Sequence, residues 1–443
     1  MIWGYVGLLD SKALTKIQSM VLVFIIIVAA VGGAIAYFFW IMPEATTVKI
    51  GVLADLGASN GRGVWQGVVL AAEQLNAKGG ILGRKIEVVG EDTDTSAGVN
   101  AEKINNALNR LLALHRVDFI IGIPAAEAVY MVQDIIAQHK KVLFDVASTP
   151  DEFTQRVLDN YDSYKYYFRV MFNATSIFQG ITDSLLLLRE QTGFNKVGYI
   201  GEDLSWTKGI MEGLDYVLPE LYGFDVVYKG AFPLGTFDFA SYFSIAEAAG
   251  VEIMVPLIAL DGAIPFVKQY HDRQSPMVIY GGILGAGVSG PEGWEITDGE
   301  CEYISGASYP VMAGYPLTSR TLPDREAYIN RWNETPGGSG CAAYDILRYI
   351  LPDAVRRAGT LEVDVVIEAL ETTSIEISNA RNFVFTPSHD MMMGENPNNP
   401  DADYWLVIVF QWIDGELIPV YPKKIMEEAG ATYTFPDWPG PWD

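Results

Sequence analysis

VKIGVLADLGASNGRGVWQGVVLAAEQLNAKGGILGRKIEVVGEDTDT, residues 48–95, decides the fold of this chain. Its first six residues are mainly apolar, which predicts a short buried strand. The apolar residues that follow recur at helical spacing and share one face of a helix: Val64, Val68, Ala71, Ala72 and Leu75. Gly79-Gly80 ends this helix, and residues 84–91 are expected to form a second strand. The order strand–helix–strand predicts an α/β fold.

The same alternation continues through two successive runs. The first run reaches residue 146, with further strands expected at residues 117–123 and 142–146. The second run starts near residue 166, and its strands are expected at residues 166–170, 196–200, 225–228, 252–257 and 278–280. Repeated strand–helix–strand units form parallel sheets with helices on both faces. Two such runs predict two doubly wound lobes in series.

The pattern is less regular after the second run. Residues 283–300 are glycine-rich and are expected to form a loop. Two apolar runs, residues 404–412 and 417–421, flank Asp414-Gly415, a dipeptide that favours the tight turn of a β-hairpin. The tail beyond residue 422 contains several prolines and tryptophans and is expected to be an irregular strap.

A long uncharged segment lies near the N-terminus. Residues 20–42 read MVLVFIIIVAAVGGAIAYFFWIM, and a helix rising ~1.5 Å per residue over this length crosses a bilayer. Lys12 and Lys16 precede the segment, so residues 1–19 are expected in the cytoplasm and the rest of the chain outside. No small-residue cleavage site follows, which predicts an uncleaved single-pass membrane anchor.

Composition excludes some partners and leaves other features open. The net charge of −25 repels phosphate backbones, so we expect no nucleic-acid partner.

Cys301 and Cys341 are the only cysteines. Outside the cell they could form one disulfide, and the alternative is two buried thiols. The tripeptides that begin at Asn173 and Asn333 are possible glycosylation sites.

The sequence contains no motif for catalysis. Its four histidines are scattered, and neither HExxH, G-x-S-x-G nor a P-loop occurs. Gly61-Arg-Gly63-Val-Trp-Gln-Gly67 only approximates a dinucleotide fingerprint, because its third glycine is one residue late. We therefore expect a protein that is not an enzyme and has no catalytic residues, no metal site and no cofactor.

The opening segment closely resembles the type I periplasmic solute-binding proteins, and most of all the branched-chain amino acid (Leu/Ile/Val) binding proteins of ABC importers. Its most specific part is NAKGGILGRK, residues 76–85. Other segments fit the family in order: residues 117–123, 167–169, 196–203, 235–243 and 407–415. The resemblance covers about residues 46–422 and implies two Rossmann-like lobes joined by a three-segment hinge.

Pattern and resemblance together divide the chain into five parts. They are a short cytoplasmic N-terminus (1–19), a transmembrane anchor (20–42), a first lobe (46–170 and 286–400), a second lobe (171–285 and 401–422) and an irregular C-terminal tail (423–443). The position of the third crossing between the lobes is left open.

The resemblance implies that a ligand binds between the lobes. Ala147-Ser148-Thr149 matches the family's turn of two small residues and a threonine, in which backbone groups and the threonine hydroxyl hold an amino-acid head group. Ser148 and Thr149 could instead cap a helix that begins near residue 151. In the second lobe, Trp206 stands where the family usually has an aromatic residue that covers the ligand.

Two departures from the family concern the ligand's charged groups. Ala126 replaces the family's serine in the loop after the third strand, which leaves only backbone N–H groups there. No carboxylate lies near Gly281-Gly282, where the family's partner for the ammonium is expected, although Asp261, Glu202 or Asp203 could substitute for it. Since a buried ammonium without a partner is costly, either one of these acids pairs with it or the ligand is not a free α-amino acid.

The family resemblance and the anchor together predict a monomeric extracytoplasmic binding protein at the cell membrane. It would deliver an amino-acid-like, amide or amine solute to an ABC permease. The alternative is a ligand-sensing receptor module of the same fold. Because residues 1–19 are too short for a signalling domain, that alternative requires a separate signalling partner.

Overall fold

The computed structural model describes residues 47–443 except 96–99, 123–125 and 260–261. The expected cytoplasmic N-terminus and transmembrane anchor lie outside the described residues. Among the helices of the described ranges, none is both long and apolar enough to span a membrane.

The first lobe is built around a five-stranded sheet with the strand order β2-β1-β3-β4-β5. Strands β1, β3, β4 and β5 run parallel, as predicted. Its N-terminal elements are β1 (Thr47–Ala54), α2 (Ser59–Ala77), β2 (Lys85–Asp92), α3 (Ala101–Asn109), the π-helical turn η1 (Arg110–His115), β3 (Phe119–Gly122), α4 (Ala126–His139), β4 (Val142–Asp145), α5 (Glu152–Asp159), α6 (Tyr161–Tyr164) and β5 (Tyr167–Arg169).

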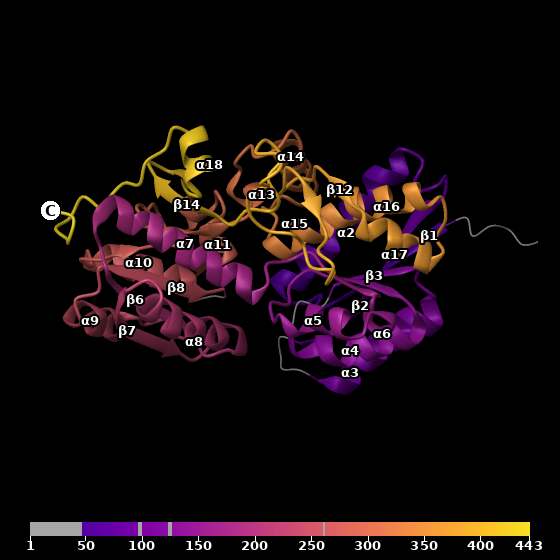
Figure 1. The fold of residues 1–443 in the computed structure, drawn as a ribbon, viewed down its shortest axis with the longest axis horizontal. Coiled ribbons are helices and arrows are strands. Elements are labelled where there is room, and N and C mark those ends of the chain that lie inside the picture. Colours follow the sequence, from indigo (N-terminus) through magenta and orange to yellow (C-terminus); the bar gives the residue numbers. More distant parts are fainter. Residues whose placement is uncertain (1–46, 96–99, 123–125, 260–261) are drawn as a thin grey trace, which may run out of the picture. The chain divides into compact units, whose positions relative to one another are not determined.

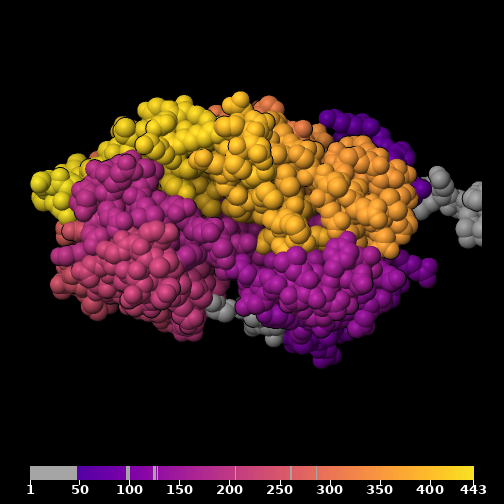
Figure 2. All heavy atoms as spheres, in the orientation of Figure 1, coloured from indigo at the N-terminus to yellow at the C-terminus, as the bar shows by residue number. Residues whose placement is uncertain are grey.

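Residues 310–384 add a second set of elements to the first lobe. They are α13 (Pro310–Ala313), α14 (Thr321–Trp332), α15 (Gly338–Asp345), η2 (Ile346–Ile350), α16 (Leu351–Ala358), α17 (Val363–Glu371), β12 (Ser374–Ile375) and β13 (Phe383–Val384). Figure 1 shows α2 and α15–α17 on one side of β3 and α3–α6 on the other. Figure 2 shows the later residues, in orange, lying directly against the earlier ones, in purple.

Alternate side chains of β3 and β4 enter different hydrophobic cores. Ile120 and Leu143 pack with α3, α4 and α5, whereas Phe119 and Phe144 pack with α2 and α15–α17. Strands β3 and β4 are therefore buried on both faces, whereas most residues of β2 are partly or fully exposed. This explains why β3 and β4 read as nearly continuous apolar runs in the sequence.

The second lobe has a sheet with the order β10-β8-β6-β7, and β9 also pairs with β8. Its paired strands are parallel. Its elements are α7 (Ala174–Thr192), β6 (Lys196–Glu202), α8 (Ser205–Glu220), β7 (Asp225–Phe232), α9 (Ala240–Ala248), β8 (Ile253–Ile258), α10 (Ala263–Arg273), β9 (Val278–Ile279), β10 (Ile283–Leu284), α11 (Ala286–Ser289), α12 (Gly293–Ile296) and β11 (Ser305–Ser308). Helices α7 and α8 pack on one face, and α9 and α10 on the other.

The pairing of β11 bears on the lobe boundary expected at residue 286, which stays a prediction. Gly306 bridges to Gly282, and the Ala307 amide donates to the Gly282 carbonyl oxygen at 2.7 Å. On its other side β11 pairs with β14 (Ile408–Ile413). Strand β11 thus belongs with β14 to a separate antiparallel sheet, which one bridge joins to the second-lobe strands, and we propose that the second crossing follows Ser308.

The predicted hairpin is confirmed, and the tail after it is more ordered than expected. Strands β14 and β15 (Glu416–Tyr421) pair around Asp414-Gly415, and both turn residues have positive φ. Helix α18 (Lys423–Glu428) follows. Beyond it, the buried Trp438 donates from Nε1 to the Ser275 carbonyl oxygen at 3.1 Å. The tail is thereby fastened to the second lobe.

Two glycines of the approximate dinucleotide fingerprint allow other parts of the backbone to approach α2 closely. A Cβ on Gly67 in α2 would lie 2.3 Å from the carbonyl oxygen of Gly340 in α15. A Cβ on Gly61 would lie 1.9 Å from the carbonyl oxygen of Asp55. Since neither neighbour is a movable side chain, glycine is required here by backbone packing, as in other sites of close approach.

Candidate functional site

The carboxyl ends of four first-lobe strands lie at one edge of the sheet. Leu53, Gly122, Asp145 and Arg169 form one row, because each is paired with the next in the strand register. The turns that follow these strands therefore begin side by side. In open α/β sheets this edge is where ligands bind.

Asp145 organises the turn that follows β4. Its buried carboxylate accepts hydrogen bonds from the amides of Ala147 at 2.9 Å and Ser148 at 3.0 Å, and from the Tyr167 hydroxyl at 2.7 Å. Burial raises the pKa of Asp145, and these hydrogen bonds oppose the rise. The turn is thus shaped by an interior acid.

Arg169 holds the same turn from its carbonyl side. Its Nη1 donates to the carbonyl oxygens of Ser148 at 3.1 Å and Pro150 at 2.6 Å. Its Nε and Nη2 donate to the two carboxylate oxygens of Asp390 at 2.9 and 2.5 Å. Asp390 also accepts from Asn173 at 2.8 Å. Arg169 is fully buried, so this bidentate pair forms an internal support for the turn.

The structure places the predicted first-lobe residues in different environments. The amides of Ala147 and Ser148 are bound to Asp145, and the fully buried Ser148 hydroxyl has no hydrogen-bond partner in the described part of the chain. Thr149 and Ala126 are half-buried. Of the two hydroxyl-bearing residues in this turn, Thr149 is therefore the one that is partly exposed.

The capping alternative for Ser148 and Thr149 is wrong. The N-cap of α5 is Asp151, and no side chain caps that helix. Instead, the Thr149 carbonyl oxygen accepts from the amide of Ala174, the first residue of α7, at 2.7 Å. The turn thus contacts the start of the second lobe.

Three acids were candidates for an ammonium partner in the second lobe. Glu202 is buried at the end of β6, and its Oε2 accepts from the Ala259 amide at 3.2 Å, which joins the ends of β6 and β8. Asp203 is exposed and forms an ion pair with Lys208 at 2.7 Å. Asp261 lies outside the described residues. Of the two candidates in the described residues, Glu202 is therefore the buried one.

Trp206 is the second residue of α8. It is half-buried and packs against the large hydrophobic core. Helix α8 begins three residues after Glu202. The partly exposed Trp206 ring and the Glu202 carboxylate thus belong to the same strand-to-helix connection.

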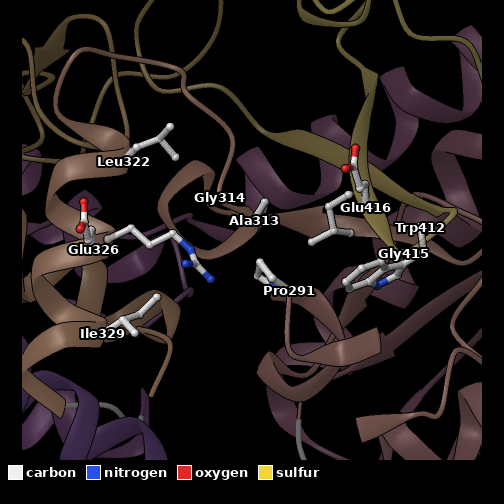
Figure 3. Close-up of a pocket in the computed structure, with 11 residues that line it drawn as sticks. Pro291, Ala313, Gly314, Leu322, Glu326, Ile329, Trp412, Gly415 and Glu416 are labelled. Atoms are coloured by element: carbon white, nitrogen blue, oxygen red, sulfur yellow. The ribbon is translucent and has the colours of Figure 1, made fainter. Parts of the chain in front are cut away.

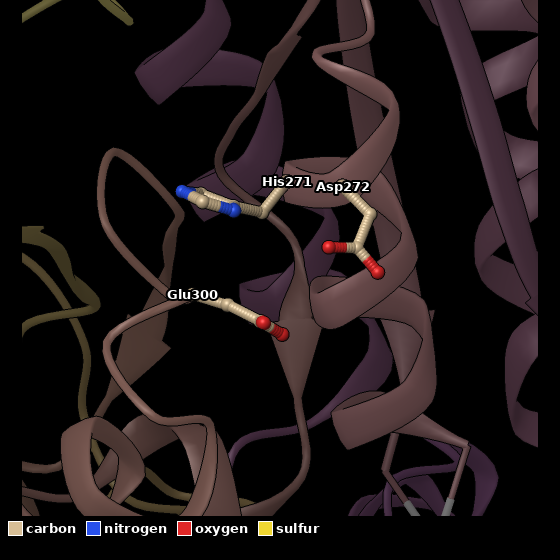
Figure 4. A group of neighbouring side chains, drawn as sticks. All are labelled: His271, Asp272 and Glu300. Atoms are coloured by element: carbon tan, nitrogen blue, oxygen red, sulfur yellow. The ribbon is translucent and has the colours of Figure 1, made fainter.

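A possible metal-binding group lies away from these turns. Single ligand atoms of His271, Asp272 and Glu300 lie within 4.8 Å of one another (Figure 4). The Lys268 ammonium lies 3.2 Å from Glu300 and 3.1 Å from Asp298. Because this cation already neutralises Glu300, we retain the prediction of no metal site.

The cysteines do not form the disulfide considered from the sequence. Cys301 and Cys341 are free and buried in different hydrophobic cores, one in each lobe. Burial raises the pKa of Cys301 to about 11 and also raises the pKa of Cys341. Both thiols are therefore packing groups.

The two possible glycosylation sites differ in exposure. The Asn173 side-chain amide accepts from the Ser176 backbone at 2.6 Å and donates to Asp390 at 2.8 Å. Asn333 is exposed at the end of α14. Modification thus remains a prediction for Asn333, whereas both polar atoms of the Asn173 side chain are already bonded.

Asp145, Arg169 and Asp390 were not identified from the sequence. Arg169 is the one charged residue inside the expected strand 166–170, and an arginine inside a buried strand requires a partner. The arginine in this strand indicates that a buried ion pair exists. It does not identify Asp390, which lies 221 residues further along the chain.

Comparison with known proteins gives a consistent result. Residues 47–397 match the family model described as periplasmic binding protein. The chain is 24% identical over 389 residues to Leu/Ile/Val-binding protein homolog 8 of Brucella melitensis biotype 1, covering 84% of this chain and 88% of that protein.

Solved structures of binding proteins share the fold. One is the substrate-binding protein of a branched-chain amino acid transporter from Streptococcus pneumoniae in complex with isoleucine, with a TM-score of 0.67, 19% identity, and coverage of 85% of this chain and 100% of that chain. Another is a leucine-binding protein from Thermotoga maritima, with a TM-score of 0.63, 21% identity, and coverage of 84% and 98%. At these identities the likeness establishes the architecture alone.

Proposed function

The chain belongs to the periplasmic binding protein family, and from this premise we propose that it is the extracytoplasmic solute-binding component of an ABC importer. We propose that its ligand is a small amino-acid-like, amide or amine solute. The observation that carries this proposal is the turn 145–149, held rigidly at the strand ends by Asp145 and by the buried Arg169–Asp390 pair. Such support holds a binding turn in one geometry before the ligand arrives.

We propose one role for each lobe. In the first lobe, Thr149 donates or accepts a hydrogen bond to the solute, and the backbone at Ala126 adds a further contact. In the second lobe, the Trp206 ring covers the solute and Glu202 pairs with its ammonium group. Closure of the lobes would then bury the solute and shift a hinge equilibrium that a membrane permease can detect. No step of this scheme breaks a covalent bond, in keeping with a protein that is not an enzyme.

Glu202→Gln tests the ligand class. A thermal-shift screen of the full chain against amino acids, amides, polyamines and ureas should identify stabilising solutes, because a ligand that binds only the folded state raises its apparent stability. For a solute with an ammonium group, we expect Glu202→Gln to weaken binding about tenfold or more through loss of a charged hydrogen bond.

The same solute without its amine should bind the unchanged protein and Glu202→Gln with equal affinity. Asp203→Asn is the matched control, because Asp203 is exposed and paired with Lys208. If Glu202→Gln lost the same affinity for the amine-free solute as for the aminated one, Glu202 would have a structural role.

We also propose that residues 20–42 anchor the protein at the membrane, with the binding module on the outer side. The uncharged sequence of that segment supports the proposal. The full chain should remain with membranes after a high-salt wash, and a variant lacking residues 1–45 should not. Recovery of both proteins in the wash would exclude the anchor.

A further inference from the structure

A second pocket lies away from the turns of the proposed solute site. It has a volume of about 600 Å³, within the range of small-molecule sites. One wall is formed by Leu322 and Ile329 of α14, and the facing wall by Pro291 and Trp412 (Figure 3). Helix α14 comes after the proposed second crossing in the sequence, whereas Pro291 and Trp412 belong to the second lobe. An occupant would therefore contact both sides of that crossing.

Arg325 is the cation of this pocket, and the protein does not satisfy it. Among the described residues, none accepts a hydrogen bond from the Arg325 guanidinium and none forms an ion pair with it. The Nε atom of Arg325 is buried without a partner. Burial lowers the pKa of Arg325 below its ordinary value, and the negative charge of Glu292 partly opposes this. An arginine has five N–H donors in a fixed plane that matches a carboxylate. The unmet donors therefore point to an acceptor from outside the chain.

The other charges near the pocket limit the ligand to a single negative charge. Glu326 and Glu416 also line the pocket, and both are exposed. Figure 3 shows their carboxylates turned away from the space between Ile329 and Trp412. A dianion such as phosphate would be repelled by these acids more strongly than a monocarboxylate. The apolar walls favour an apolar body next to the charged group.

We propose that this pocket is a second binding site, for a small monocarboxylate with an apolar body held by Arg325. The site is separate from the proposed solute site, and its existence does not depend on that function. A ligand that contacts both walls would stabilise the conformation in which α14 and Trp412 are as far apart as they are in this structure.

Titration of the full chain with 4-fluorobenzoate, followed by fluorine NMR, tests the proposal. We expect saturable binding, and the neutral 4-fluorobenzamide should bind at least about tenfold more weakly because it lacks the charge-assisted hydrogen bonds. Arg325→Gln should weaken 4-fluorobenzoate to the same extent. Glu292→Gln should tighten it, because a repelling charge is removed.

Two controls separate this site from others. Arg331→Gln removes an exposed charge from the same helix, where Arg331 pairs with Glu73, and should leave the affinity within about twofold. Thr149→Ala should also leave it unchanged, whereas a loss would mean that the probe binds at the proposed solute site. Absence of saturable binding, or affinity unaltered by both Arg325→Gln and Glu292→Gln, would overturn the proposal.

Discussion

Replacing Arg169 with methionine is expected to lower the free energy of unfolding by about 3–5 kcal/mol, because it leaves the buried Asp390 carboxylate without its cation. The side chain of Arg169 is 0% exposed and that of Asp390 is 7% exposed, so water cannot replace the lost partner. The same change removes the donors that hold the carbonyl oxygens of Ser148 and Pro150. Urea denaturation of the full chain at pH 7 measures the effect.

Two variants make this result interpretable. Arg169→Met combined with Asp390→Leu should recover much of the lost stability, because the uncompensated charge is removed as well. Arg331→Met should cost less than about 1 kcal/mol, since its ion pair with Glu73 is exposed on both sides. A loss for Arg169→Met as small as that for Arg331→Met would contradict a supporting role for the buried pair.

Asp345→Asn is expected to change how stability depends on pH. Asp345 is buried in α15 and accepts hydrogen bonds from the Ser378 amide at 3.1 Å and from Asn379 Nδ2 at 2.8 Å. Burial raises the pKa of Asp345 from its ordinary value of 3.8 to about 7, although these hydrogen bonds oppose the rise. Between those two values the folded protein keeps a proton that the unfolded chain has lost. Stability is therefore lost as the pH rises through this window.

A rise in pKa from 3.8 to about 7 corresponds to a total loss of about 4 kcal/mol. The amide introduced by Asp345→Asn does not titrate, so the Tm of this variant relative to the unchanged protein should increase from pH 4 to pH 8. Calorimetric scans at both pH values measure this difference. Asp401→Asn, at an exposed position, should show the same Tm difference at both. A constant difference for Asp345→Asn would show that Asp345 is ionised in the folded protein throughout.

The regular parts of the fold could be predicted because their signals are local. Strands β3 and β4 are buried on both faces, so they appear as apolar runs such as residues 142–146. Asp414-Gly415 identified the hairpin because that turn requires positive φ at both positions. A strand near residues 302–308 could be predicted, but its pairing with Gly282 and β14 could not. Ser305–Ser308 contains only small residues, so no local signal identifies its partners on either side.

The candidate site was predicted only in part. The resemblance led to the turn at Ala147-Ser148-Thr149, but the amides of the first two residues face the interior acid Asp145. The partner of Arg169 could not be found, because Asp390 approaches it only after the chain has passed through the second lobe and back. Such long-range pairings depend on the tertiary fold and leave no local pattern.

The central claim is that one solute is held by residues from both lobes. Calorimetric titration of the full chain with a stabilising solute from the screen, repeated for Thr149→Ala and Trp206→Ala, tests it most directly. We predict binding of one solute per chain, weakened by about 1–3 kcal/mol in Thr149→Ala through an unsatisfied buried group, and also weakened in Trp206→Ala with the fold intact. Absence of any binding solute, or the same affinity in both variants as in the unchanged protein, would contradict the claim.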